Sequence, residues 1–362
     1  MDSAQDFPKA PDRVVKALRA GMVIPAHPLA LNSNRTLDES HQRALSRYYL
    51  DAGAGGLAVG VHTTEFAIHD PKVGLYRPVL ELAMETVSTW KPLNALLGPP
   101  LMVAGIIGKT SQAVGEAQTA RELGYDVGLL GLGALSGYSD EQLVEHARRV
   151  ARVLPIMGFY LQPAVGGRIL SEAFWRQLAE IPNLVAIKMA PFNRYYTLAV
   201  IRAVAAAGAA GQIALYTGND DSILVDLLTR FQIVVEKGTV TLEVAGGLLG
   251  HWAYWTERAV EQLEQVRSAK RRDTIPSDLL TLAAQVTESN EAVFDPENAF
   301  RGCIAGILYV LASSGLVAGV HPLGRDEGLS PGQAEKIDAV MARYPHLTDH
   351  QFVRENLDRW LA

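Results

Sequence analysis

The stretch LPIMGFYLQPAVGGRILSEAFWRQLAEIPNLVAIKM, residues 154–189, decides the fold class. Two short apolar runs, 154–161 and 183–189, enclose a polar loop and the segment 171–181, whose apolar residues recur at helical spacing. Apolar strands on either side of a helix are typical of a parallel sheet that is buried on both faces. The stretch therefore predicts a strand–helix–strand unit.

The same unit recurs along most of the chain. Strands are expected on this pattern at residues 21–29, 55–61, 100–107, 126–132, 154–161, 183–189 and 212–218. Helices are expected between them, at residues 38–52, 77–90, 110–123, 140–153, 171–181, 195–207 and 220–231. Residues 233–250 contain Glu236, Lys237 and Gly238, which predict a hairpin inserted before a last barrel strand near 246–250. A helix from His251 to about Lys270 would close the ring.

Eight such units over about 250 residues predict an α/β fold, a (β/α)8 TIM barrel at residues 21–270. An open doubly wound sheet normally carries a glycine-rich phosphate turn after its first strand, and none follows here. Residues 1–20 are polar and charged, lack the apolar core of a signal peptide, and are expected to form a short arm. From residue 271 helical patterns recur without strands, which predicts a C-terminal helical extension at 271–362. Its helices are expected at 277–289, 296–315, 330–344 and 349–362.

Composition excludes several classes of protein. Hydrophobic residues make up 48% and charged residues 20% of the chain, as in globular proteins, and no window approaches the roughly 18 apolar residues of a membrane span. The net charge of −6, without clusters of basic and aromatic residues, argues against nucleic-acid binding. The one cysteine, Cys303, lies in an apolar stretch and is expected to be a small buried hydrophobe. It excludes an internal disulfide framework and indicates a reducing, cytoplasmic setting.

Lys188 is the most informative residue, because it follows four apolar residues in the expected strand 183–189. Active sites of TIM barrels lie at the carboxyl ends of the strands. A lysine buried there is either paired with an acid or functional, because an unpaired buried ammonium is very costly. Desolvation favours the neutral amine, which can attack a ketone and form an imine. The alternative is a salt-bridged lysine at the barrel rim.

Tyr160 ends the preceding strand and is expected to neighbour Lys188 across the barrel mouth. A phenol in that position can pass protons between the amine, the carbinolamine oxygen and the substrate. The alternative is a core tyrosine whose hydroxyl reaches the surface.

Two loops at the ends of other strands supply further candidates. In the loop VHTTEF, residues 61–66, Thr63 and Thr64 can hold a carboxylate through hydroxyls and backbone N–H groups, or can bond only their own backbone. In TGNDD, residues 217–221, Gly218 and Asp220 are substrate-binding candidates, and the acids can contact a polyhydroxylated substrate. The alternative is that Asn219 and Asp220 cap the next helix.

Metal binding is not expected. His62, Glu65, His69 and Asp70 lie close in sequence, but their spacing matches no metal signature, and a solvated loop is the expectation. No metal or organic cofactor is therefore expected. His251, near the end of the eighth strand, is a further substrate-binding candidate, and Gly250 and Trp252 are expected to line the same part of the pocket.

Over residues 21–255 the chain resembles the dihydrodipicolinate synthase/N-acetylneuraminate lyase superfamily of class I aldolases. The most specific matches are FYLQP (159–163) and IPNLVAIK (181–188), supported by residues 52–65, 103–126 and the TGNDD segment. The resemblance implies a TIM barrel in which Lys188 forms a Schiff base with a 2-oxo acid and Tyr160 moves protons. Members of this superfamily are commonly tetramers, so a homo-oligomer, dimer or tetramer, is expected.

The chain departs from the superfamily pattern at positions that matter for the synthases. His62 replaces the first hydroxyl of the usual pair on the second-strand loop, and Thr63 alone is carried over. The paired tyrosines of the synthases fall at about Ala134 and Leu135, and their arginine falls at about Val165, with Arg168 three positions on. These losses argue against authentic dihydrodipicolinate synthase.

The expected function is therefore a Schiff-base lyase of the aldolase type that acts on pyruvate or a related 2-oxo acid. Lys188 and Tyr160 are its expected catalytic residues, and His62 is hypothesised to act as an acid or base, since imidazole titrates near neutral pH. The alternatives are a sugar-acid or 2-oxo-acid dehydratase or hydratase that uses the same imine, and a non-catalytic ligand-binding barrel. The expected partner is a small-molecule 2-oxo acid, with neither nucleic acid nor membrane.

Overall fold

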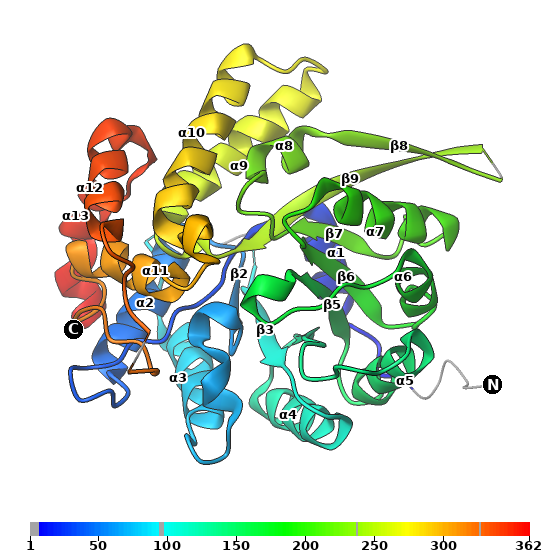
Figure 1. Cartoon of the computed structure of the whole chain (residues 1–362), viewed down its shortest axis with the longest axis horizontal. Coiled ribbons are helices and arrows are strands. Elements are labelled where there is room, and N and C mark those ends of the chain that lie inside the picture. Colours follow the sequence, from blue (N-terminus) through cyan, green and yellow to red (C-terminus); the bar gives the residue numbers. More distant parts are fainter. Residues whose placement is uncertain (1–6, 94–97, 237, 326) are drawn as a thin grey trace. The chain divides into compact units, whose positions relative to one another are not determined.

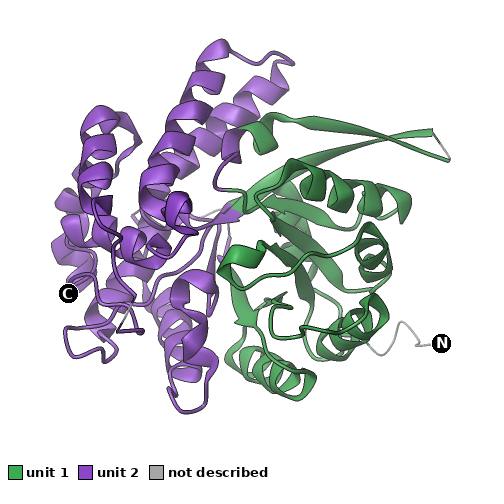
Figure 2. Ribbon diagram, in the orientation of Figure 1, with its two compact units in different colours: residues 1–22, 101–219, 225–247 green, residues 23–100, 220–224, 248–362 purple. Residues whose placement is uncertain are grey.

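The computed structural model describes residues 7–93, 98–236, 238–325 and 327–362, and Figure 1 labels its helices and strands. Residues 1–6 of the expected arm and Lys237 of the expected hairpin lie outside the described residues. The chain divides into two compact units (Figure 2). Unit 1 contains residues 1–22, 101–219 and 225–247, and unit 2 contains residues 23–100, 220–224 and 248–362.

Unit 1 holds a run of parallel strands in the order β3-β4-β5-β6-β7-β9. These strands are β3 (Leu101–Ile106), β4 (Val127–Leu130), β5 (Ile156–Leu161), β6 (Leu184–Ala190), β7 (Ala214–Thr217) and β9 (Gly238–Leu249). The helices of this unit are α1 (Asp12–Ala20), α4 (Thr110–Leu123), α5 (Asp140–Ala151), α6 (Glu172–Leu178) and α7 (Arg194–Ala206). α8 (Ile223–Leu228) and β9 have residues in both units. Nearly every residue of β3 to β7 is buried, as expected for strands covered on both faces.

The expected N-terminal arm is in part a helix, because α1 occupies residues 12–20. It ends at Gly21, whose φ of +81° lies in the left-handed region. A Cβ on Gly21 would lie 1.8 Å from the carbonyl oxygen of Ala245 in β9, so only glycine permits this close approach of two backbones.

Unit 2 begins with β1 (Val23–Pro25) and β2 (Gly56–Val59), which are joined by a parallel bridge between Ala26 and Ala58. Its helices are α2 (Glu39–Asp51), α3 (Tyr76–Thr89), α9 (Thr256–Arg271), α10 (Ser277–Phe294), α11 (Cys303–Ser313), α12 (Gln333–Arg343) and α13 (His350–Leu361). The C-terminal helices therefore share a unit with the first two strands. The domain boundary expected at residue 270 does not coincide with a boundary between the units.

Eight parallel strands, β1 to β7 and β9, alternate with helices and are followed by the C-terminal helices. This is a (β/α)8 TIM barrel with a C-terminal helical extension, as predicted. The inserted hairpin is also present, since β8 (Arg230–Val235) pairs with β9 in antiparallel register. The separate last strand predicted near 246–250 is absent from the described chain, because β9 runs without interruption through both the hairpin and the barrel. Among the described residues, no helix has the length and apolar character needed to cross a membrane.

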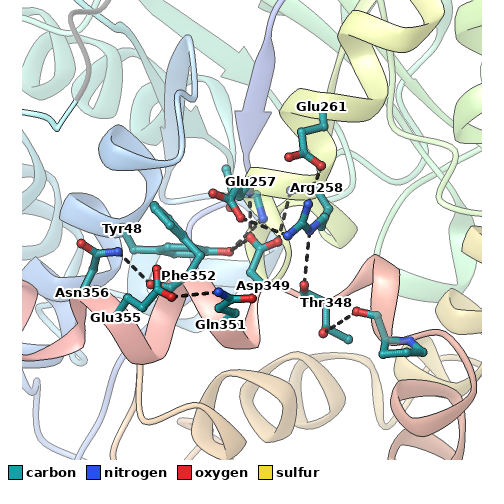
Figure 3. Close-up of polar contacts among 12 residues, drawn as sticks. Tyr48, Glu257, Arg258, Glu261, Thr348, Asp349, Gln351, Phe352, Glu355 and Asn356 are labelled. Carbon is teal, nitrogen blue, oxygen red and sulfur yellow. Dashed lines mark hydrogen bonds and ion pairs between the residues drawn. The ribbon is translucent and has the colours of Figure 1, made fainter.

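A buried carboxylate fixes the last helix within unit 2 (Figure 3). Asp349, the residue before α13, accepts hydrogen bonds from the backbone N–H groups of Glu257 (2.7 Å) and Arg258 (3.1 Å) in the first turn of α9. The hydroxyl of Tyr48 in α2 donates to the same carboxylate at 2.5 Å. Because the first N–H groups of a helix have no partner within the helix, Asp349 satisfies donors that burial would otherwise leave unpaired.

Candidate active site

Lys188 is buried in β6, near the carboxyl end of the strand, with 7% of its surface exposed. Its amine Nζ lies 4.5 Å from the centroid of the Phe159 ring, within the range of a cation–π interaction. A Cβ on Gly218 would lie 2.6 Å from Cε of Lys188, so the missing side chain at position 218 makes room for the lysine. The prediction that Lys188 is a buried strand lysine is confirmed.

The register of β5 and β6 separates Tyr160 from Lys188. Phe159 is opposite Lys188, and Tyr160 is opposite Met189. Successive side chains of a strand point to opposite faces, and residues opposite each other share a face. Tyr160 therefore lies on the other face of the sheet from Lys188, and the expectation that the two side chains are neighbours is wrong.

Tyr160 packs in the layer of helices. Its ring lies 5.4 Å from the ring of Trp175 in α6 and 5.8 Å from that of Tyr196 in α7. Its hydroxyl donates to the carbonyl of Leu170 and accepts from the N–H of the same residue, both at 3.3 Å. Burial raises the pKa of Tyr160, which disfavours a phenolate base. The described geometry thus places Tyr160 as a core tyrosine, and its catalytic role is a prediction without geometric support.

In unit 2, the hydroxyls of Thr63 and Thr64 are engaged with the backbone. Thr64 Oγ1 donates to the carbonyl of His27 at 2.6 Å and accepts from the N–H groups of Gly60 (3.0 Å) and Val61 (3.2 Å). Thr63 Oγ1 donates to the carbonyl of Ala26 at 2.7 Å. Each hydroxyl thus donates its single hydrogen to a backbone carbonyl and not to a substrate carboxylate. Carboxylate binding by these residues remains a prediction.

The loop that was expected to be solvated is folded into two 3-10 turns, His62–Thr64 and Phe66–His69. Glu65 and His69 are both buried, with 5% of their surface exposed, whereas His62 is half-buried and its ring lies 5.6 Å from that of Phe66. The solvated-loop expectation is wrong for Glu65 and His69, which the turns carry inward, whereas Asp70 is exposed as expected. Among the described residues no group of three His, Cys, Asp or Glu side chains is arranged to hold a metal.

Glu65 joins the second-strand loop to the C-terminal extension. Its carboxylate accepts from the backbone N–H of Leu323, with distances of 2.8 and 3.1 Å to the two oxygens. Burial raises the pKa of Glu65 to about 7, and the nearby carboxylate of Glu327 adds to the shift. Its backbone φ of +66° is unusual for a residue other than glycine.

Two polar residues of the TGNDD segment, Asn219 and Asp220, accept hydrogen bonds from backbone N–H groups of other segments. The Asn219 amide accepts from the backbone N–H of Phe192 at 3.1 Å and donates to Thr197 and Asp226. The Asp220 carboxylate accepts from the backbone N–H of His251 at 3.1 Å. Helix capping by Asn219 and Asp220 and substrate contact by Gly218 and Asp220 both remain predictions.

His251 follows β9 and is almost fully buried, as is Trp252. Burial lowers the pKa of His251 to about 4, so the ring is neutral at physiological pH. Nδ1 lies 2.9 Å from the hydroxyl of Tyr254.

Arg168, the nearest arginine to the position used by the synthases, is tied to the backbone. Its guanidinium donates to the carbonyls of Leu135 and Tyr138. These bonds link the loop after β5 to the loop after β4 within unit 1, and they use N–H donors that could otherwise bind a carboxylate.

Cys303 is buried, as expected, and burial raises the pKa of its thiol.

Sequence reasoning missed several residues of this region. Sequence reasoning assigns Phe159 no role beyond the strand. Successive side chains of a strand point to opposite faces, so Phe159 and Tyr160 cannot both face Lys188. Tyr254 contacts His251 directly and donates a hydrogen bond to Asn290. The sequence does not indicate this pairing, because Asn290 lies 36 residues from Tyr254.

The amine of Lys188 is buried near the carboxyl end of a barrel strand, against the ring of Phe159 and in space left by Gly218. A lysine in this position of a barrel can form an imine with a carbonyl compound. The model of the dihydrodipicolinate synthetase family matches residues 20–248, and the chain belongs to that family.

Relatives and solved structures agree with this membership. The chain is 27% identical to a 4-hydroxy-tetrahydrodipicolinate synthase of Moorella thermoacetica over 213 residues, which is 58% of this chain and 66% of that relative, just under two thirds. Dihydrodipicolinate synthase from Oceanobacillus iheyensis superposes with a TM-score of 0.73 at 17% identity, covering 92% of this chain and 100% of that one. N-acetylneuraminate lyase from Fusobacterium nucleatum complexed with pyruvate has a TM-score of 0.69 at 16% identity, covering 91% and 98%. At these identities the structures establish the fold.

Proposed function

We propose that the chain is a Schiff-base lyase of the aldolase type that acts on pyruvate or a related 2-oxo acid. The observation that carries the proposal is the buried amine of Lys188 in a barrel of a lyase family. A structurally similar lyase was solved with pyruvate, which supports a 2-oxo acid as the substrate class. We also propose that the enzyme is cytoplasmic and homo-oligomeric, as the resemblance implies.

In the proposed reaction the lone pair of Nζ forms a bond to the ketone carbon, and the carbonyl π electrons move to oxygen. Proton transfer to that oxygen and loss of water leave an iminium ion on Lys188. A carbon–carbon bond then breaks or forms, with the iminium accepting or returning the electron pair, and water releases the product. The face of the Phe159 ring, 4.5 Å from Nζ, stabilises positive charge at the nitrogen.

The proton transfers need a group other than Tyr160 in its present position, because its hydroxyl is bound to Leu170. His62 stays a proposed acid or base of the reaction, since imidazole is the side chain suited to this role near neutral pH. Unchanged turnover and pH profile in His62→Ala would remove this assignment.

We propose that the enzyme is not an authentic dihydrodipicolinate synthase. Ala134 and Leu135 occupy the positions of the paired tyrosines, and Arg168 is committed to backbone carbonyls. The second carboxylate of that reaction's substrate would therefore lack its partner. An imine-forming dehydratase uses the same lysine, and product analysis separates the two, since an aldolase releases two fragments and a dehydratase one.

A non-catalytic ligand-binding barrel is a second candidate, favoured by the outward position of Tyr160. Borohydride reduction in the presence of pyruvate, followed by peptide mass mapping, distinguishes the two. A stable adduct on Lys188, absent from Lys188→Met, is the expected result. No adduct across a panel of 2-oxo acids would establish the binding protein instead.

A further inference from the structure

The hairpin formed by β8 and the first half of β9 lies within unit 1 and presents an edge strand (Figure 1). Among the described residues, β8 pairs with β9 alone. The pairing runs from Arg230 opposite Glu243 to Val235 opposite Gly238 without a bulge. The outer edge of such a strand is a row of backbone N–H and C=O groups that another strand can bind.

The edge of β8 lacks the features that usually prevent strands of two molecules from pairing. Those features are charged side chains, proline and bulges within the strand. Residues 231–235 read FQIVV, with neither a charge nor a proline, and Val234 has 81% of its surface exposed. Charges stand only at the two ends of this segment, where Arg230 and Glu236 have opposite signs.

One face of the hairpin is apolar. Residues opposite each other in a pair of strands share a face, and Phe231 is opposite Leu242. Both of these are buried, and α7 packs against β8 in the same unit. Nearer the turn, Ile233, Val235 and Val240 on this face are only half-buried. A two-stranded ribbon is marginally stable by itself, so additional strands would stabilise this part of the hairpin.

We propose that β8 pairs in antiparallel orientation with β8 of a second copy of this chain, across a two-fold axis at Ile233. In an antiparallel pair, alternate residues direct their backbone N–H and C=O groups toward the partner strand. The residues of β8 that do not bond to β9 in this way therefore face outward, and in the new pair they must oppose each other. An axis at Ile233 meets this condition, because it places Gln232 opposite the partner's Val234.

The same register continues the apolar face from one copy to the other. Phe231 lies opposite the partner's Val235, and the two Ile233 side chains lie opposite each other. The result is a four-stranded antiparallel sheet with one apolar face. Because the axis makes the contact isologous, each β8 edge is used once and the assembly is closed.

Charge complementarity selects this register. Arg230 lies opposite the partner's Glu236, and the two-fold axis makes this pair twice. A shift of the register by two residues in either direction places Val234 opposite Arg230 or Gln232 opposite Glu236, and the charged pairs are lost. Arg230 also donates to Glu243 of its own hairpin at 3.1 Å, and a guanidinium has enough N–H donors for two carboxylates.

The inference rests on the proposed homo-oligomer and assigns one of its interfaces to the hairpin. The first test uses the full-length chain and Glu236→Arg, which places like charges opposite each other in both pairs. The dissociation constant at this interface should rise at least about tenfold, measured as molar mass by sedimentation over a range of concentrations. Thr241→Arg is the matched control, because it adds a positive charge to the same face but on β9. It should leave the molar mass unchanged.

The second test restores the pairs in a mixture. Arg230→Glu/Glu243→Arg reverses the ion pair within the hairpin and places like charges opposite the partner's Glu236. Alone, this double variant should associate as weakly as Glu236→Arg. A mixture of the two should recover the association of the wild type, because each then opposes the other with opposite charges.

Three outcomes overturn the inference. Variants that dissociate alone and do not associate in the mixture show that the substitutions damaged the hairpin. A wild-type oligomer that every variant leaves intact uses another surface, and the proposed homo-oligomer then stands. A monomeric wild type overturns the proposed homo-oligomer as well, and leaves the β8 edge to a strand of a different protein. Adduct formation with pyruvate on the same samples tests the proposed lyase separately.

Discussion

The amine of Lys188 faces the ring of Phe159 at 4.5 Å, while the adjacent Tyr160 points to the opposite face of β5. A shift of one residue in strand register exchanges the two faces of a strand, so the spacing between a tyrosine and a lysine along the chain does not establish their contact. The difference decides which ring meets the amine. A phenyl ring stabilises positive charge, but it carries no proton to transfer.

Tyr160→Phe should leave imine formation almost unchanged, within about threefold, since among the described residues its hydroxyl bonds to Leu170 alone. Loss of those bonds should lower the free energy of unfolding by about 1 kcal/mol. Rates of borohydride inactivation with pyruvate, and thermal unfolding, check both expectations. A loss of imine formation greater than about a hundredfold, near 2.7 kcal/mol, would show that the phenol reaches the amine during the reaction.

Gly218→Ala should impair imine formation at least about tenfold, because the new methyl group would lie 2.6 Å from Cε of Lys188 and 2.8 Å from Cβ of Ala190. The measurement is the rate of adduct formation with pyruvate, accompanied by a thermal midpoint. Gly211→Ala is the matched control, because a Cβ there meets no atom within 4 Å. Equal rates in the two variants would contradict the positioning role of Gly218.

Wild type should lose stability as the pH rises and Glu65 ionises, and Glu65→Gln should remove this loss because glutamine does not titrate. Burial raises the pKa of Glu65 from 4.5 to about 7, so the folded chain binds this proton more tightly than the unfolded chain. The stability that the carboxyl contributes is complete below about pH 4.5 and is lost as the pH rises through about 7, a change of at most about 3 kcal/mol.

The measurement compares thermal midpoints of wild type and Glu65→Gln at about pH 5 and about pH 8. The two should be similar at the lower pH, and the variant should be the more stable at the higher pH. Asp349 should also lose stability as the pH rises, since burial raises its pKa to about 7. The difference in thermal midpoint between wild type and Glu65→Gln therefore isolates the contribution of Glu65. A difference that does not change with pH would contradict the assignment.

Asp349→Ala should lower the free energy of unfolding by about 2–4 kcal/mol, because it removes the acceptor of the N–H groups of Glu257 and Arg258 and the short hydrogen bond from the hydroxyl of Tyr48. Urea unfolding provides the measurement. Asp338→Ala removes an exposed carboxylate that accepts from Tyr309 and should cost about 0.5 kcal/mol. Equal effects would show that burial of Asp349 is unimportant.

The fold was predictable from the sequence because its signal is local. Apolar runs of strand length alternate with helical patterns, and the helix predicted at residues 110–123 has those bounds in the structure. Errors lie where distant contacts decide. Phe231 was assigned to a helix, but it packs opposite Leu242 in the hairpin, a pairing that helical periodicity does not reveal.

The candidate site was predictable only in part. Burial of Lys188 follows from its apolar neighbours, whereas the direction of Tyr160 depends on a register that the sequence does not state. The burial of Glu65 and its hydrogen bond could not be predicted either, because its partner Leu323 lies 258 residues away in the sequence. Side chains whose partners are remote cannot be assigned from spacing.

The C-terminal extension is bonded to the first strands and helices of its unit, and this constrains how the family can vary here. Asp51 in α2 pairs with Arg359 and accepts from the indole of Trp360 at 2.7 Å, and the guanidinium of Arg35 donates to the carbonyl of Pro322. A chain that ended after α9 would expose apolar surface and would leave the side chains of Asp51 and Arg35 without these hydrogen-bond partners. Shortening the C-terminal extension without loss of stability would therefore also require substitutions at Arg35 and Asp51.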